Sequence, residues 1–304
     1  MKKLILTFLI IISLLLVAAV GYRLLRVPIR QDTTKINVTA TFYPLAEFTK
    51  AVGADWITVE TLIPPGSEPH DFDLTPKEIV HLDQSSLFIY NGAGFESWIE
   101  KVIPQIETNK IKIVNMSSKV DLILEDDTMP DPHFWLDPQS AIKEVAAIQQ
   151  ALDEIDPTHA EYYSRNADSY INRLEQLDRT ISEQLGRCTK RDIIVSHDAF
   201  GYYARRYNLN VVSIAGLSPE EEPSAQRLAE ISQFAKNNAV KYIFFESLVS
   251  PRLSDTIAKE VGAQTLVFNP IEGLTQAQVN RGENYFSVQE ENLRNLKIAL
   301  ECEL

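Results

Sequence analysis

The 304-residue sequence has few of the residues that mark specialised classes of protein. It contains two cysteines, 11 glycines and 15 prolines, and it shows no internal repeat or low-complexity stretch. Disulfide-rich scaffolds, collagen-like repeats and disordered chains are therefore excluded, because each needs a strong bias in composition. Hydrophobic residues make up 45% of the chain and charged residues 23%, as in ordinary globular proteins. At about 150 residues per domain, this length predicts two domains.

Positive charge is also scarce. The chain has 29 Lys and Arg against 42 Asp and Glu, a formal net charge of −13. Because residues 1–30 hold five basic residues and no acid, the net charge of the remainder is −18. A body this acidic repels phosphate backbones, so we expect no nucleic-acid partner. Cations or a basic partner surface would instead be attracted.

The amino terminus predicts the compartment. Lys2 and Lys3 precede an uncharged, almost wholly apolar run at residues 4–20, which is typical of an export signal. The run is longer than a usual signal core of about 7–15 residues and reaches the lower limit for a membrane-spanning helix. No cysteine stands directly after this run, which argues against a lipoprotein. We expect an extracytoplasmic protein anchored through residues 4–20, with cleavage of this segment as the alternative.

The two cysteines, Cys188 and Cys302, would lie in an oxidising compartment, where a disulfide can form. Each follows a predicted helix, and we predict that they pair. Sequence spacing alone does not place them side by side, so two separate buried thiols are the alternative.

Strands and helices alternate along both halves of the chain. Alternating or short apolar runs predict strands at residues 36–40, 57–63, 87–90, 111–114, 192–195, 211–213, 241–245 and 265–268. Capping residues and helical spacing predict helices at residues 44–52, 75–83, 137–152, 199–207, 224–237, 253–261 and 289–300. Such alternation is typical of mostly parallel sheets.

Between the halves, Pro157 to Leu185 has no further glycine or proline and repeats apolar residues at helical spacing. This segment predicts one long helix of roughly 44 Å. The predicted fold is α/β, with two doubly wound lobes joined by one rigid helix and a cleft between them. The expected divisions are residues 1–30 (signal or anchor), 31–153 (N-terminal lobe), 154–188 (linking helix) and 189–304 (C-terminal lobe).

Three of the five histidines occupy positions suited to a ligand. His70 and His133 lie in proline-rich loops, and His197 ends a predicted strand, whereas His81 lies within a helix and His159 in a first helical turn. We expect the last two to be solvated. Imidazole is the commonest metal ligand, and a rigid loop or strand end fixes it in place. However, the sequence lacks the local zinc signatures His-Glu-x-x-His and Cys-x-x-Cys, so ordinary surface or core histidines remain the alternative.

Five stretches together resemble a known family, the metal-binding subunits of bacterial zinc and manganese ABC importers (the cluster A-I or TroA-like solute-binding proteins). The stretches are TFYPLA (41–46), IPPGSEPHDF (63–72), PDPHFWLDP (130–138), SHDAFGY (196–202) and FNPIEGLT (268–275). The resemblance runs from about residue 36 to the end of the chain.

The resemblance implies a set of metal ligands. The matching histidine motifs supply ligands in the family, which points to His70, His133 and His197. The fourth ligand comes from the last motif. An aspartate of some members would align near Asn269, whereas zinc-type members use the glutamate of Asn-Pro-x-Glu, which matches Glu272. Imidazole suits zinc and manganese prefers carboxylates, so we expect Zn(II), with Mn(II) as the alternative.

Many zinc-binding members carry a histidine-rich loop before the second ligand. This chain has only Glu125, Asp126 and Asp127 there, so metal capture by such a loop is not expected. Two acids are candidates for supporting roles. Asp137 would either orient His133 or cap a helix, and Glu246 would either assist at the same cleft or serve as a cap or salt-bridge partner.

The function implied by the resemblance is an extracytoplasmic zinc receptor, monomeric and without enzymatic activity, that delivers Zn(II) to an ABC permease in the membrane. One alternative is a manganese receptor or adhesin of the same fold. Another is a secreted zinc hydrolase, because three histidines can also hold a catalytic metal with an open fourth position. Glu272 distinguishes the receptor from the hydrolase, because as a fourth ligand it would leave no open position on the metal.

Overall fold

The computed structural model of the protein describes residues 35–106, 110–125 and 128–303. The predicted signal or anchor lies outside this part of the chain. Within the described residues, no helix combines the length and the apolar character needed to cross a membrane.

The N-terminal lobe contains a four-stranded sheet in the order β2-β1-β3-β4, with every neighbouring pair parallel. Its strands are β1 (Ile36–Ala40), β2 (Ile57–Thr61), β3 (Leu87–Tyr90) and β4 (Lys112–Asn115). Its helices are α2 (Tyr43–Gly53), α3 (Pro76–Leu82), α4 (Ile99–Val102) and α5 (Pro138–Ile155). Parallel neighbours require crossover connections, which α2, α3 and α4 supply.

The C-terminal lobe repeats this design with the order β10-β9-β7-β8, again all parallel. Its strands are β7 (Asp192–Val195), β8 (Asn210–Ser213), β9 (Tyr242–Phe245) and β10 (Gln264–Val267). Its helices are α7 (Gly201–Tyr207), α8 (Ala225–Asn237), α9 (Arg252–Val261), α10 (Gln276–Asn280) and α11 (Tyr285–Ala299). The predicted fold class is confirmed. Helices α4 and α10 and the antiparallel hairpin of β5 (Leu124–Glu125) with β6 (Met129–Pro130) were not predicted from the sequence.

Successive strand residues face opposite sides of each sheet, and both sides are covered by helices. In β3, Phe88 packs in a cluster with α3 and α4, while Ile89 joins the largest hydrophobic cluster of the protein. In β7, Ile194 packs with α8 and α9, while Ile193 joins that same largest cluster. The two lobes therefore share one main core and have one smaller outer core each.

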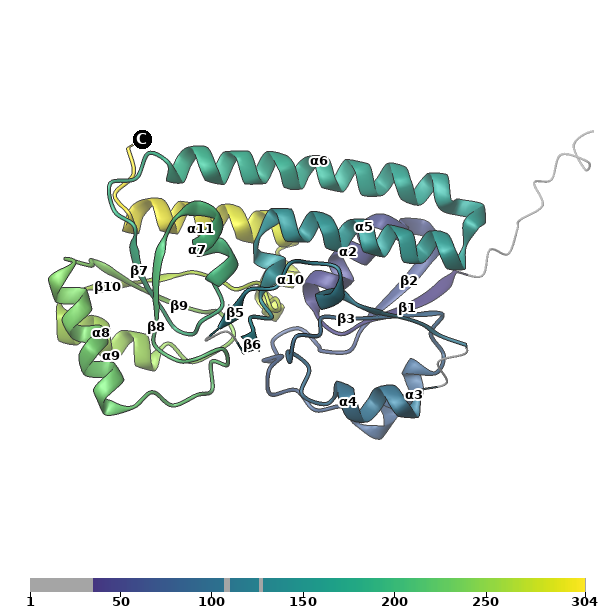
Figure 1. Ribbon diagram of the computed structural model, residues 1–304, viewed down its shortest axis with the longest axis horizontal. Helices are drawn as coiled ribbons and strands as arrows, with labels where there is room; N and C mark the ends of the chain where they lie inside the picture. The colour runs from purple at the N-terminus through teal and green to yellow at the C-terminus, as the bar shows by residue number, and fades with distance from the viewer. Residues whose placement is uncertain (1–34, 107–109, 126–127, 304) are drawn as a thin grey trace, which may run out of the picture. The chain divides into compact units, whose positions relative to one another are not determined.

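The long helix α6 (Ala160–Leu185) contacts α2 and α5 of the N-terminal lobe and α7 and α11 of the C-terminal lobe, and it runs along both lobes in Figure 1. Its buried positions recur at helical spacing, as expected. They are Tyr163, Ala167, Tyr170, Leu174, Leu177, Asp178, Ile181 and Leu185. The predicted linking helix is confirmed, although residues 157–159 form a 3₁₀ turn before it.

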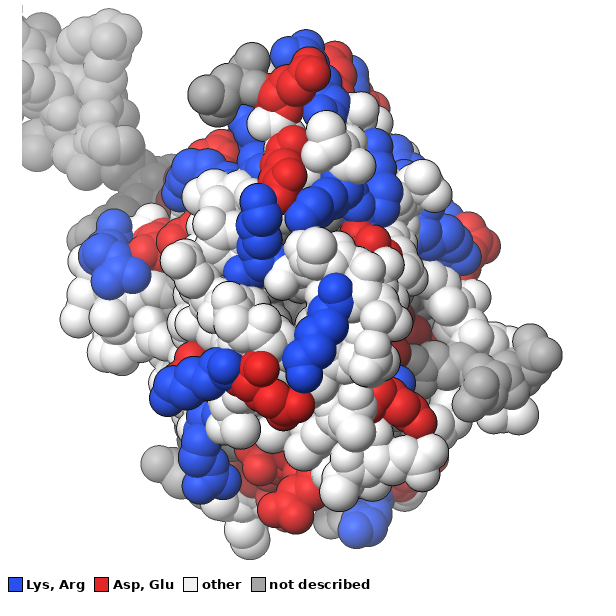
Figure 2. Space-filling model, turned by 90° about the vertical axis from the view of Figure 1, so that its left-hand side faces the viewer, with Lys and Arg blue, Asp and Glu red and all other residues white. Residues whose placement is uncertain are grey.

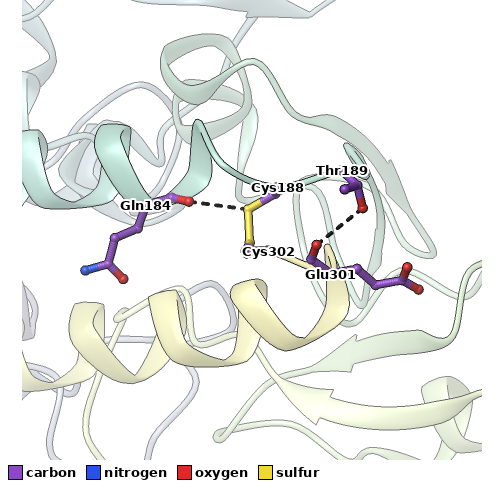
Figure 3. The surroundings of a disulfide bond; sticks show 5 residues. All are labelled: Gln184, Cys188, Thr189, Glu301 and Cys302. Atoms are coloured by element: carbon purple, nitrogen blue, oxygen red, sulfur yellow. Dashed lines mark hydrogen bonds between the residues drawn. A yellow bond between two sulfur atoms is a disulfide. The ribbon is translucent and has the colours of Figure 1, made fainter. Parts of the chain in front are cut away.

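Cys188, just after α6, and Cys302, just after α11, form a disulfide, so the predicted pair is confirmed (Figure 3). A hydrogen bond from a side chain to the backbone reinforces the junction. The Thr189 hydroxyl donates a hydrogen bond to the Glu301 carbonyl, at 3.3 Å. The disulfide thus ties the end of the linking helix to the C-terminal end of the chain.

Acidic and basic side chains are mixed on the surface. On the face shown in Figure 2, Lys and Arg side chains lie interspersed with Asp and Glu among the described residues. The described residues include ion pairs of Glu301 with Lys190 at 2.9 Å and with Lys241 at 2.8 Å. Exposed pairs of this kind contribute little to stability, and this face offers no broad area of positive charge for nucleic acid.

Candidate metal centre

The structure brings the four candidate ligands together. One donor atom from each of His70, His133, His197 and Glu272 lies within 4.8 Å of all the others. The Glu272 Oε1 atom lies 3.4, 3.4 and 3.2 Å from the Nε2 atoms of His70, His133 and His197 respectively. The His133 Nε2 atom lies 3.2 Å from that of His70 and 3.4 Å from that of His197. The His133, His197 and Glu272 side chains are fully buried, and only the His70 side chain is exposed, by 9%.

His70 lies on the loop between β2 and α3, which three prolines stiffen. The loop turns at Gly66, whose φ of +85° favours glycine. The Gly66 N–H donates to the Leu274 carbonyl at 2.9 Å, so the His70 loop is bonded to the loop that carries Glu272. The ring of Phe95 packs edge-on against the His70 imidazole, with ring centres 4.7 Å apart.

His133 follows the β5–β6 hairpin, and Asp131 holds it in place. The Asp131 Oδ1 atom accepts hydrogen bonds from the His133 backbone N–H at 2.9 Å and from its Nδ1 at 2.8 Å. The sequence analysis considered Asp137 for this role. Asp137 instead caps α5, where its Oδ1 accepts from the Gln139 N–H at 3.0 Å. The spacing Asp-x-His, which lets the acid reach both nitrogens, is the signal that was missed.

His197 follows β7, and Glu246 follows the neighbouring strand β9. Because parallel strands end at the same edge of a sheet, the two side chains meet there. The Glu246 Oε1 atom lies 2.6 Å from the His197 Nδ1 atom and also accepts the hydroxyl hydrogen of Ser196. Glu246 is only 2% exposed. The expectation that it assists at the same cleft fits this contact.

Glu272 is presented by a tight turn. The Asn269 Oδ1 atom accepts from the Ile271 N–H at 2.7 Å, and Ile271 adopts a left-handed φ of +58°. Asn269, the position at which the resemblance would allow an aspartate, therefore stabilises the turn, and its side-chain nitrogen donates to the Ser247 hydroxyl at 3.0 Å. Neither carboxylate oxygen of Glu272 has a hydrogen-bond partner, although both are buried. A buried, unpaired carboxylate is costly unless a cation accompanies it.

The hydrogen bonds fix the protonation of two imidazoles. A carboxylate only accepts, so the Nδ1 atoms of His133 and His197 carry the hydrogens that bind Asp131 and Glu246. Their Nε2 lone pairs then face one another and the Glu272 carboxylate at 3.2 to 3.4 Å. Converging lone pairs repel, and a metal ion relieves this repulsion.

Without a metal, His133 and His197 bind protons more readily than free imidazoles do. Burial opposes a charge on His197, but the carboxylates of Glu246 and Glu272 outweigh it and raise the pKa of this imidazole well above its usual value. Burial lowers the pKa of His133, but the acceptor carboxylate of Asp131 and the neighbouring carboxylate of Glu272 outweigh it, so this pKa is also raised. Burial opposes a charge on Glu272 too, yet the surrounding histidines bring its pKa well below the usual value. The cluster thus favours positive charge at its centre.

The spacing of the donor atoms matches tetrahedral zinc. With bonds of about 2.0 to 2.1 Å, the ligand atoms of a tetrahedron lie about 3.3 Å apart. Five of the six separations between the donor atoms fall between 3.2 and 3.4 Å, and the sixth is within 4.8 Å. Four protein donors would leave no open position, which a catalytic zinc needs.

Of the other two histidines, His159 is not part of this cluster. His81 belongs to α3. His159 is not simply solvated, as the sequence analysis expected. Its Nδ1 atom lies 2.6 Å from the Asp156 Oδ2 atom, and its ring stacks on Trp56 with ring centres 3.6 Å apart. His159 therefore joins the start of α6 to the N-terminal lobe.

Comparison with known proteins finds zinc-uptake and zinc-binding relatives of this chain. The family model described as "Zinc-uptake complex component A periplasmic" matches residues 38–299. The high-affinity zinc uptake system protein ZnuA of Bacillus subtilis is 37% identical, over 96% of this chain and 96% of its own. The zinc-binding lipoprotein AdcA of Streptococcus pneumoniae is also 37% identical, over 88% of this chain, which spans 56% of that longer protein.

Solved structures give the same result. The Zn(II)-bound ZnuA-like domain of S. pneumoniae AdcA has a TM-score of 0.79 and 38% identity, covering 88% of this chain and 99% of its own. The laminin-binding protein Lmb of Streptococcus agalactiae, described as having adhesin and metal-transporting activity, has a TM-score of 0.80 and 30% identity, covering 88% of this chain and 100% of its own. From the family match, these relatives and the shared fold, it follows that the chain belongs to the ZnuA family of zinc-uptake binding components.

Proposed function

We propose that the protein is an extracytoplasmic receptor that binds one Zn(II) ion through His70, His133, His197 and Glu272 and delivers it to an ABC permease. The observation that carries this proposal is the set of donor separations of 3.2 to 3.4 Å, which fits the tetrahedron that zinc prefers. Membership of the ZnuA family supports the transport role. Zinc is the cargo here, and the protein is not an enzyme.

Each lobe supplies half of the ligands. His70 and His133 come from the N-terminal lobe, and His197 and Glu272 come from the C-terminal lobe. The ion would therefore bridge the lobes, and separating them would divide the ligand set. Glu272 supplies one negative charge directly, and Asp131 and Glu246 supply two more through the imidazoles. Together these three negative charges more than offset the two positive charges of the ion in a buried site.

The donor set favours zinc over manganese. Three imidazoles and one carboxylate suit zinc, whereas manganese prefers oxygen donors. The closed site also argues against the secreted hydrolase, which would need an open coordination position for water. Metal analysis of the purified protein after competition between zinc and manganese tests this choice, and preferential retention of manganese would contradict it.

We propose that the protein is held at the outer face of the membrane through residues 4–20 and is not a lipoprotein. The absence of a cysteine after this run supports the proposal, although the relative AdcA is named a lipoprotein. Cell fractionation with N-terminal sequencing tests it. A freely soluble mature form that begins near residues 20–31 would contradict anchoring.

The remaining parts of the proposal concern organisation. The divisions at residues 31–153, 154–188 and 189–304 are supported by the two sheets and by the helix between them. A monomer without a nucleic-acid partner is supported by the acidic charge and by a site that one chain completes. Light scattering of the zinc-loaded protein would show one chain per particle, and a stable dimer would contradict this.

A competition titration against a chromophoric zinc chelator tests the ligand set. Replacing His197 with Ala removes a buried donor and should weaken zinc binding by orders of magnitude. His81→Ala and His159→Ala are the matched controls, since His81 belongs to α3 and His159 is not part of the cluster, and they should bind zinc like the wild type. Equal affinity of the wild type and His197→Ala would refute the assignment.

A further inference from the structure

Tyr202 belongs to the C-terminal lobe but forms its hydrogen bonds with the N-terminal lobe. It lies in α7, and its side chain is buried. The hydroxyl accepts from the Ile123 N–H at 2.9 Å and donates to the Asp131 carbonyl at 3.0 Å. The Asp131 N–H in turn donates to the Ile123 carbonyl at 2.9 Å. The phenol therefore closes the base of the β5–β6 hairpin from across the boundary between the lobes.

Asp131, which the phenol holds, is the residue that orients His133. Its Oδ1 atom binds both the backbone N–H and the Nδ1 of His133, at 2.9 and 2.8 Å. The neighbour of Tyr202 also contacts this aspartate. A Cβ atom added to Gly201 would lie 2.6 Å from the Asp131 Oδ2 atom, so a side chain at this position would force the Asp131 carboxylate to shift. Tyr202 thus bonds to the backbone of Asp131 in the other lobe, and the adjacent Gly201 leaves room for the Asp131 carboxylate.

We propose that Tyr202 is a positioning residue that couples contact between the lobes to retention of zinc. With the lobes together, Tyr202 fixes Asp131, and Asp131 fixes the His133 imidazole in the tautomer and direction that zinc needs. Separating the lobes removes both hydrogen bonds of the phenol, so His133 loosens as the C-terminal ligands withdraw. This inference rests on the proposed zinc site and adds a coupling of zinc release to lobe separation.

The adjacent residue supplies a matched control. Tyr203 is equally buried on the same helix, but its hydroxyl has no hydrogen-bond partner. Tyr202→Phe and Tyr203→Phe therefore remove the same atom from neighbouring rings, and only the first removes contacts to Asp131. A general effect of losing a buried hydroxyl would appear in both variants.

Stopped-flow measurement of zinc dissociation into excess chelator is the direct test. Tyr202→Phe should release zinc about 10-fold faster, the lower end of the effect expected for residues that orient metal ligands, with an unchanged association rate. Tyr203→Phe should release it at the wild-type rate. Thermal unfolding followed by circular dichroism would show that both variants are folded. Gly201→Ala, which crowds the Asp131 carboxylate, is a second variant and should also speed release.

A double-mutant cycle then tests whether Tyr202 acts through Asp131. If it does, Tyr202→Phe should change the dissociation rate little in an Asp131→Ala background, because the residue it positions is gone. An unchanged release rate for Tyr202→Phe, or an equal effect in both backgrounds, would overturn the inference while leaving the zinc site in place. A wild-type protein that fails to bind zinc would instead refute the proposed function.

Discussion

Replacing Glu246 with Gln should weaken zinc binding while preserving the shape of the site. The Glu246 Oε1 atom lies 2.6 Å from the His197 Nδ1 atom, and both side chains are buried. Glutamine has nearly the same volume and can still accept a hydrogen bond. It lacks the negative charge that favours the imidazole hydrogen on Nδ1 and makes Nε2 a stronger donor to the metal.

The expected loss is about 10- to 100-fold in affinity, the range found when partners of metal-bound histidines are replaced. This corresponds to about 1.4 to 2.8 kcal/mol of binding free energy. The affected imidazole is fully buried, so solvent would not substitute for the missing charge.

The size of the loss should depend on pH. In the metal-free protein, burial opposes a charge on His197, but Glu246 and Glu272 outweigh it and raise its pKa. Zinc must displace this proton, so acid weakens binding by the wild type. Without the Glu246 charge the pKa of His197 falls, and protons compete less in the variant. The difference in affinity between the two proteins should therefore narrow as the pH falls.

Competition titrations at pH 8 and pH 6 measure both effects. Glu144→Gln is the matched control, because Glu144 is equally buried but bonds to none of the four ligands, and its zinc affinity should equal that of the wild type. The reasoning would be refuted if Glu246→Gln bound zinc as tightly as the wild type at pH 8. It would also be refuted if the difference in zinc affinity between the two proteins widened at pH 6.

Three further predictions concern stability. Replacing Cys188 and Cys302 with Ala should lower the free energy of unfolding by about 4 to 5 kcal/mol, the value that the chain-entropy model gives for a separation of 114 residues. Zinc affinity should not change. Equal urea midpoints for the proteins with and without the disulfide would contradict this prediction. Burial raises the pKa of Glu144 well above its usual value, so the unfolded chain loses this proton near pH 4 to 5 while the folded protein keeps it. Stability is thereby lost as the pH rises above that range, and Glu144→Gln should remove this loss; parallel stability curves of variant and wild type between pH 4 and pH 8 would contradict it. His159→Ala should lower the free energy of unfolding by about 1 kcal/mol, because it loses the stacking on Trp56, and an unchanged melting temperature would contradict this.

Much of the fold could be predicted because its signals are local. The strands β1, β3 and β7 have the predicted bounds, since each is a short apolar run ended by polar or turn residues. The hairpin β5–β6 was missed because two-residue strands carry no periodicity, and α10 was missed because five residues make little more than one helical turn.

The candidate ligands were predicted from motifs, and the supporting residues were predicted less well. Asp131 and Asp137 stand on either side of His133, and the sequence analysis considered only Asp137. Pro138 explains the outcome, because Asp137 before a proline is suited to begin a helix and its carboxylate is used as the cap. Asp131 was left free to bond to the imidazole. Glu246 was easier to predict, since it ends a strand beside that of His197.

The convergence of the ligands depends on contacts between the lobes, which no local pattern reveals. The Trp135 indole donates to the Pro270 carbonyl at 2.8 Å, and the Tyr285 hydroxyl donates to the Trp135 carbonyl at 2.7 Å. The loop that carries His133 is thus bonded to the loop that carries Glu272 and to the start of α11. Because these bonds are buried and direct, opening the lobes must break several of them together. Zinc exchange should therefore be limited by separation of the lobes, and a receptor of this design would retain its ion until a partner supplies the energy of opening.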